Sequence, residues 1–120
     1  MADTQKTFAT VLGIVLLVVG LAGFVSGGLG IVREGFFGTN AAQDVLHIIG
    51  GLLGIWFGTK GAGSGYNLTI GWIGIVLAVL GFIPGIKEML MTYLNVNTNI
   101  SVLHAVIGVV ALLVYYKAER

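Results

Sequence analysis

The sequence predicts an all-α integral membrane protein, a four-helix bundle built from two tandem helical hairpins. Its composition is the first reason: 57% of the 120 residues are hydrophobic and only 9% are charged, whereas a soluble domain carries about 25% charged residues. The second reason is a set of four long apolar stretches, and the third is an internal repeat that relates the two halves of the chain. We therefore expect a single transmembrane domain over 1–120.

Four apolar stretches divide the chain, at about 8–28, 41–58, 68–85 and 100–116. Each approaches the ~20 residues that a helix needs to cross a ~30 Å hydrocarbon core. Each is apolar on all sides, so it must satisfy its backbone polar groups internally when it lies in lipid. All four stretches are therefore predicted to be transmembrane helices.

The two halves of the chain resemble each other. A shift of 58 positions superimposes the first and third stretches, and a shift of 57 superimposes the second and fourth. The matching pairs include Gly13–Gly71, Gly23–Gly81, Asn40–Asn97 and His47–His104. We expect one repeat over about 7–59, a Gly/Ser linker at 60–66, and a second repeat over about 67–117. Each repeat holds two helices, so both enter the membrane from the same side.

Basic residues are divided unequally between the two sides of this bundle. One side carries Lys6, Lys60, Lys117 and Arg120, and the other carries Arg33 and Lys87. The positive-inside rule then places both termini in the cytoplasm, in a multi-pass protein of the cell membrane. Aromatic residues at the cytoplasmic side are expected to form an interfacial belt, consisting of Phe8, Trp56, Tyr66, Trp72, Tyr115 and Tyr116. The loop at 86–99 on the outer side is expected to include a short surface helix.

Glycine is the second compositional anomaly, with 20 residues in the chain against an average near 7%. Small residues drive the packing of membrane helices because they let backbones approach closely. We expect close packing at Gly13, Gly20, Gly23, Gly27, Gly50, Gly54, Gly58, Gly71, Gly74, Gly81, Gly85 and Gly108. A competing interpretation is that Gly20, Gly23, Ala78 and Gly81 clear room for a flat cofactor.

Asp44 is the acidic residue expected to lie within a membrane helix. It falls in the first turn of the second helix, after Asn40 as a plausible cap, where the helix dipole stabilises a carboxylate. Alternatively it orients the imidazole of His47, which lies three residues later on the same helix face.

His47 and His104 are the strongest candidates for function, since ionisable residues inside a membrane are costly. Both lie on faces rich in small residues, so we expect both to point into the bundle at equal depth. Three interpretations stay open. Each histidine makes one interhelical hydrogen bond; or both are axial ligands of one haem b, whose propionates pair with Arg33 and Lys87; or they serve a proton path or a metal. Two histidines alone make a weak site for a metal such as zinc.

Two resemblances bear on this pair. The stretch Asn97…Val102-Leu103-His104…Gly108, with its weaker copy Asn40…His47…Gly51, resembles a family of short prokaryotic four-helix membrane proteins classed as a domain of unknown function. That resemblance implies a fold and a membrane location but no activity. The arrangement is also similar to the cytochrome b four-helix haem bundle, whose second and fourth helices carry the haem ligands. That bundle carries two histidines on each ligand helix, so the resemblance implies one haem at most here.

The sequence therefore predicts a structural or interaction subunit that packs through its glycines, with a haem b redox protein as the alternative. No catalytic constellation can be placed, so we expect no enzyme activity. Its partner is the lipid bilayer, together with other membrane subunits or a second copy for the interaction role. The net charge of +1 and the lack of a basic cluster argue against nucleic-acid binding.

Overall fold

The computed structural model describes residues 3–25 and 39–120, and this part of the chain contains five helices and no strand. In order they are α1 (Asp3–Gly23), α2 (Ala41–Thr59), α3 (Gly63–Leu80), α4 (Ile86–Leu94) and α5 (Thr98–Lys117). All of these except α4 are long and apolar enough to cross a membrane. The predicted all-α membrane bundle is confirmed, and α4 is the short helix expected between the last two spans.

Two helices, α1 and α3, begin and end about five residues earlier than the spans expected at 8–28 and 68–85. α1 begins at Asp3, ahead of the apolar stretch, and α3 begins at Gly63, so the connection after α2 is only 60–62 instead of a linker over 60–66. The glycine explains why α3 starts early. A Cβ atom at Gly63 would lie 2.7 Å from the carbonyl oxygen of Gln5, so its absence lets this first turn of α3 lie against α1.

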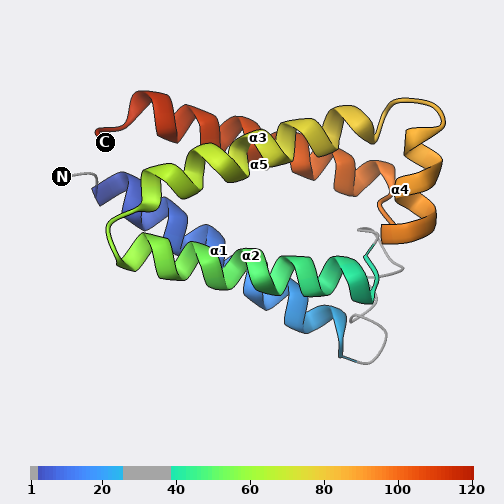
Figure 1. Cartoon of the computed structure of the whole chain (residues 1–120), viewed down its shortest axis with the longest axis horizontal. Helices are drawn as coiled ribbons and strands as arrows, with labels where there is room; N and C mark the ends of the chain where they lie inside the picture. The colour runs from blue at the N-terminus through green and yellow to red at the C-terminus, as the bar shows by residue number, and fades with distance from the viewer. Residues whose placement is uncertain (1–2, 26–38) are drawn as a thin grey trace.

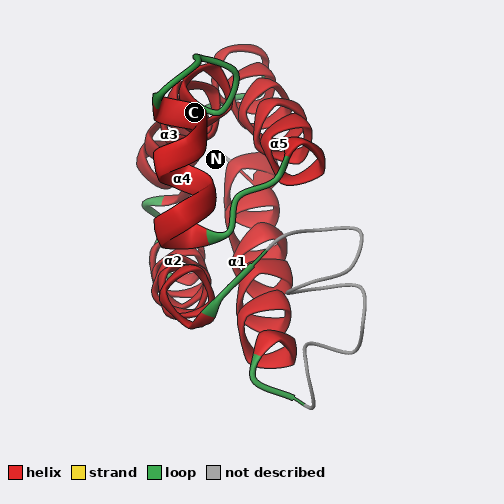
Figure 2. Ribbon diagram, turned by 90° about the vertical axis from the view of Figure 1, so that its right-hand side faces the viewer, coloured by secondary structure: helices red, strands yellow, loops and turns green. Residues whose placement is uncertain are grey.

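The helices pair as two hairpins, α1 with α2 and α3 with α5 (Figure 1). Both chain ends and the α2–α3 connection lie at one end of the bundle, and α4 lies at the other. The hairpins approach each other closely at the end with the termini and diverge toward α4. Figure 2 looks along the bundle and shows α4 lying across the open end, from the α3 side to the α2 side.

Glycines make the closest contacts inside each hairpin. A Cβ at Gly13 would lie 2.6 Å from the carbonyl oxygen of Gly51, and a Cβ at Gly108 would lie 2.8 Å from that of Gly71. Such distances leave no space for a side chain, so the paired backbones are in direct contact. These two contacts occupy equivalent positions under the shifts of 58 and 57.

A buried polar network joins the two hairpins at the end with the termini. Gln5 and Asn67 are both fully buried, and the Asn67 side-chain amide donates to Gln5 Oε1 at 2.8 Å. Gln5 Nε2 in turn donates to the carbonyl oxygen of Val114 at 2.7 Å. α1, α3 and α5 are thereby held together by buried hydrogen bonds, each of which would be costly to leave unmade.

At the opposite end, amide side chains hold α4 against the start of α2. Asn40 Nδ2 donates to the carbonyl oxygen of Tyr93 at 2.9 Å, and Gln43 Nε2 donates to that of Leu94 at 2.7 Å. These carbonyls belong to the last turn of α4 and have no partner within a helix. The start of α2 therefore adds hydrogen bonds to the end of α4, where the backbone N–H of Asn95 also caps the helix.

Asn40 serves both helices, because its Oδ1 also accepts from the backbone N–H of Gln43 at 2.9 Å and so caps α2. We predict that Asn40→Ala lowers the free energy of unfolding by ~1–2 kcal/mol, the cost of losing such a cap. Thermal unfolding in detergent micelles measures this. The control is Thr98, the exposed residue that follows Asn97, the cap of α5. Thr98→Ala should change stability by less than ~0.5 kcal/mol, and an equal loss in both variants would contradict the prediction.

The outer faces of the helices carry exposed branched and aromatic side chains. Examples from the spanning helices are Val11, Val18, Leu52, Val79, Val106 and Leu113, each about half exposed. No other part of the described chain covers these side chains, so they face the lipid. The described glycines with close contacts lie on the opposite faces, where they meet other helices of the chain.

Candidate functional site

The divergence of the two hairpins leaves a cavity of about 640 Å³ between them. This volume falls within the ~300–1,000 Å³ typical of small-molecule sites. α2 and α3 provide most of its wall, α1 and α5 complete the sides, and α4 closes one end with Leu90 and Leu94. The wall is almost entirely apolar, and its polar side chains are Gln43, His47, Tyr66, Thr69 and His104.

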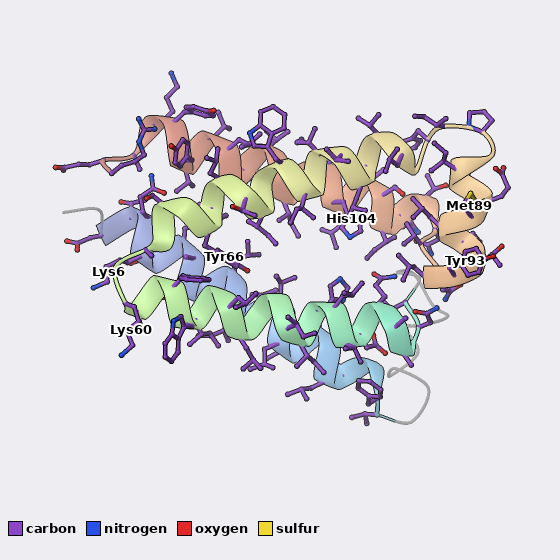
Figure 3. All side chains as sticks on the ribbon, viewed as in Figure 1. Lys6, Lys60, Tyr66, Met89, Tyr93 and His104 are labelled. Atoms are coloured by element: carbon purple, nitrogen blue, oxygen red, sulfur yellow. The ribbon has the colours of Figure 1, made fainter. Side chains whose placement is uncertain are left out.

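His47 and His104 both line this cavity, one from each hairpin. Each is the seventh residue of its helix, counted from Ala41 in α2 and Thr98 in α5, so both lie about two turns from the end covered by α4. Figure 3 shows His104 extending from α5 into the space between the hairpins. The two imidazoles therefore share one chamber.

Each imidazole has a buried nitrogen that makes no hydrogen bond. Nδ1 of His47 and Nδ1 of His104 are both inaccessible to solvent and have no partner in the described part of the chain. Neither histidine thus uses Nδ1 for an interhelical hydrogen bond. Because each ring also lines the cavity, Nε2 is the nitrogen that a ligand can reach.

Asp44 lies away from this chamber. It is fully buried, and a Cβ at Gly23 would collide with its carboxylate, which places the side chain between α1 and α2. His47 Nδ1 accepts nothing from it and donates nothing to it. Asp44 therefore does not orient His47 through Nδ1. It lies in the first turn of α2, where the helix dipole stabilises it.

The comparison with family models identifies the relatives of this chain. Residues 6–116 match the model of the family described as a domain of unknown function, DUF4383. The chain belongs to this family. No curated protein matches it, and no solved structure matches it, so the likeness to the cytochrome b bundle gains no support from known structures.

In this DUF4383 member, the space beside the small residues expected to make room for a flat cofactor is filled by atoms of the neighbouring helix. A Cβ at Gly20 would lie 2.7 Å from the carbonyl oxygen of Asp44, and one at Gly81 would collide with the Ser101 side chain. Neither residue lines the cavity, and nor do Gly23 and Ala78. The glycines on the cavity wall are Gly50, Gly65 and Gly74.

Two glycines differ from the packing role expected for them. A Cβ at Gly50 would meet only Leu16, at 3.7 Å, so this residue borders the cavity and makes no close backbone contact. Gly85 has open space around it and a φ of +90°, and it precedes α4. Its role is the left-handed turn that redirects the chain into α4, which residues with a Cβ rarely adopt.

Of the two expected cationic partners, Lys87 is not on the cavity wall. Lys87 is exposed and lies beside Glu88 in a separate surface hollow near the start of α5. Arg33, together with Gly27, lies outside the described residues. No lysine or arginine of the described chain lines the cavity, and these residues contain no group of three or more possible metal ligands.

The sequence predicts Tyr66 in an interfacial aromatic belt, but in the structure its side chain points inward and is 8% exposed. Its hydroxyl donates to the carbonyl oxygen of Gly50 at 2.8 Å. Since Gly50 is in the first hairpin and Tyr66 in the second, this bond ties them together across the cavity. Gln5 and Asn67 were not singled out either, because a polar residue near the end of an apolar stretch resembles an ordinary interfacial residue.

The start of α4, which closes the cavity, depends on pH through Glu88. The Glu88 carboxylate accepts from the backbone N–H of Gly85 at 2.5 Å, and hydrogen bonds from its own N–H and from that of Gly85 lower the pKa of Glu88 below its ordinary value of 4.5. Because the pKa of Glu88 is lower in the folded protein, the contribution of this carboxylate to stability is complete above its ordinary pKa. The contribution is lost as the pH falls through the lowered pKa of Glu88.

We therefore predict that the Gly85 amide proton shifts upfield as the pH is lowered past the ordinary pKa of Glu88, because the carboxylate that binds it becomes neutral. NMR titration of the protein in detergent micelles measures this shift. Glu88→Gln should abolish the titration, and a Gly85 shift that persists in this variant would refute the assignment.

Proposed function

We propose that this membrane protein binds a small, largely apolar molecule in the cavity between its hairpins. The observation that carries the proposal is the pair of imidazoles, His47 and His104, on the wall of one apolar chamber. Ligand sites are typically apolar cavities with a few convergent polar groups. Ionisable residues kept inside a membrane usually mark a functional site.

A purely structural or interaction role through the glycines receives less support. The close glycine contacts are made inside the chain, mostly between the paired helices of each hairpin, and at Gly54 and Gly63 between the two hairpins. The outward faces carry mainly bulky apolar residues, which suit lipid better than close helix–helix approach. Assembly with other membrane subunits or with a second copy thus has no dedicated small-residue surface among the described residues.

Haem b is the second candidate ligand, favoured by the two imidazoles in one chamber. His47 and His104 would be its axial ligands, and the haem would supply redox chemistry. Two features argue against it: no cation of the described chain lines the cavity for the propionates, and neither Nδ1 has the hydrogen-bond acceptor that an iron-ligating histidine normally has. An absorbance spectrum tests it: a Soret band lost in His47→Ala and in His104→Ala would support haem, whereas a colourless protein after expression with excess haem would exclude it.

Two further proposals concern architecture and location. We infer that the hairpins arose by duplication, since Gly23 against Asp44 in the first hairpin corresponds to Gly81 against Ser101 in the second. Both termini and the α2–α3 connection lie at the same end, and that end carries four of the six bases. This charge bias supports cytoplasmic termini in the cell membrane.

Co-purification tests the binding proposal. The protein and its Gly50→Leu variant are purified in mild detergent, and their solvent extracts are compared by mass spectrometry. Leucine at position 50 projects into the cavity without meeting backbone, so it should remove a co-purified small molecule while leaving the melting temperature within a few degrees. Val106→Leu, on the lipid-facing side of α5, is the matched control and should retain the molecule. Identical extracts from all three proteins would contradict the proposal.

A further inference from the structure

We infer that the ligand is an uncharged molecule with a hydrogen-bond acceptor on each side of a compact head and one apolar tail, the chemistry of a prenylated quinone. This inference rests on the proposed binding function and adds the ligand class. Its basis is the position of the two imidazoles, the tautomer that their surroundings favour, the charge of the wall and the length of the apolar part of the cavity.

The tautomer follows from the buried nitrogens. A neutral imidazole carries its proton on one nitrogen, and the other accepts. A proton on Nδ1 of His47 or of His104 would need an acceptor, and none lies within reach in the described chain. The proton therefore belongs on Nε2, so each histidine presents an N–H donor to the cavity. Iron ligation would require the opposite arrangement, with Nε2 bare and Nδ1–H hydrogen-bonded.

Two donors reach the chamber from opposite hairpins, His47 from α2 and His104 from α5. A molecule that satisfies both needs acceptors on opposite sides. The carbonyl oxygens of a quinone ring lie on opposite sides of a flat head and accept such bonds. A head with a single acceptor, such as that of a long-chain alcohol, would satisfy one donor and leave the other unpaired, at a cost comparable to a lost hydrogen bond.

The wall also selects against charge. No aspartate, glutamate, lysine or arginine of the described residues lines the cavity. A charged head would be desolvated there without a partner, which is far more costly than burying a neutral polar group. Phospholipid heads and haem propionates are therefore disfavoured relative to an uncharged head.

The remaining length of the cavity fits a tail. The histidines lie toward the end covered by α4, while Leu53, Phe57, Ile70 and Ile73 line the cavity in the direction of the termini. From His47 to Phe57, α2 rises about 15 Å at ~1.5 Å per residue. A molecule with its head at the histidines can thus extend an apolar chain of this length along α2 and α3.

The two histidines are the only ones in the chain, so ¹⁵N-histidine labelling gives an NMR spectrum of these imidazoles alone. Their signals are assigned with His47→Leu and His104→Leu. The labelled protein in detergent micelles is titrated with decylubiquinone, a quinone with a ten-carbon tail. We expect Nε2 to be the protonated nitrogen of both rings before addition and both Nε2 signals to shift saturably, at one quinone per chain. Each leucine variant should weaken binding about tenfold, the loss of one hydrogen bond, and Val106→Leu should not change it.

Two parallel titrations separate the alternatives. Dioctanoylglycerol supplies an uncharged lipid with another head, and haemin supplies the tetrapyrrole. Three results would each overturn the proposal that the ligand is a quinone. These are equal saturable shifts with dioctanoylglycerol, a Soret band with haemin accompanied by loss of the Nε2 protons, and no shift with decylubiquinone. If decylubiquinone does not bind while Gly50→Leu still removes a co-purified molecule, the cavity binds another class of ligand. If both tests fail, the binding function itself is wrong.

Discussion

Replacing Gly13 by valine should separate α1 from α2 and prevent the first hairpin from forming. A Cβ at this position would lie within 2.9 Å of three backbone atoms of α2, contributed by Gly51, Gly54 and Ile55. Backbone cannot move aside as a flexible side chain can, so the helices must separate and lose their contact surface. Overpacking of a well-packed core typically costs ~1–3 kcal/mol and sometimes more, and we expect the upper part of this range.

Unfolding in a titration with sodium dodecyl sulfate, followed by circular dichroism, measures the effect. Gly65→Ala is the matched control, because a Cβ at Gly65 in α3 meets nothing within 4 Å. Alanine there should leave stability unchanged or raise it by up to ~1 kcal/mol, since it favours the helix over glycine. If Gly13→Val unfolds at the same detergent concentration as Gly65→Ala, the close backbone contact between α1 and α2 is refuted.

The second large effect is expected for Gln5→Leu. Leucine removes one acceptor of the Asn67 amide and the side-chain donor to the Val114 carbonyl. The amide still donates to the backbone carbonyl of Gln5, and the Val114 carbonyl still accepts from the N–H of Ala118. Each lost hydrogen bond contributes about 0.5–1.5 kcal/mol, so the loss of stability should reach ~1–3 kcal/mol when both are counted.

A double variant distinguishes this mechanism from a packing defect. Replacing both members of a buried hydrogen-bonded pair by apolar residues is far less costly than replacing one. Gln5→Leu combined with Asn67→Leu should therefore recover a substantial part of the stability lost in Gln5→Leu alone. Additive losses in the same unfolding measurement would argue against a shared network.

The fold could be predicted largely from the sequence because in lipid the options for a backbone are few. Long stretches that are apolar on all sides, such as 41–58, leave only the helix, and the cap at Asn40 followed from residue type. The start of α3 at Gly63 was missed because it depends on a tertiary contact with Gln5, which no local pattern reveals.

The candidate site was predicted only in part. The repeat identified His47 and His104, but periodicity alone cannot say whether a small-residue face meets another helix or an open space. Gly20 and Gly81 meet their partner helices, while Gly50 and Gly65 border the cavity. The inward position of Tyr66 depends on the carbonyl oxygen of Gly50 in the other hairpin, so it follows from the tertiary arrangement.

The central claim is that His47 and His104 face each other across one chamber, and crosslinking tests it most directly. The chain contains no cysteine, so His47→Cys combined with His104→Cys gives a protein with two thiols only. A protease site placed in the connection at 60–62 allows the hairpins to be separated after treatment with a short bifunctional thiol reagent. We predict that the cleaved halves stay joined on a denaturing gel, and that the control pair His47→Cys with Leu113→Cys, which adds a lipid-facing position, separates. The claim would be contradicted if the halves of the His47→Cys, His104→Cys protein separate, or if the halves of both double-cysteine proteins stay joined equally.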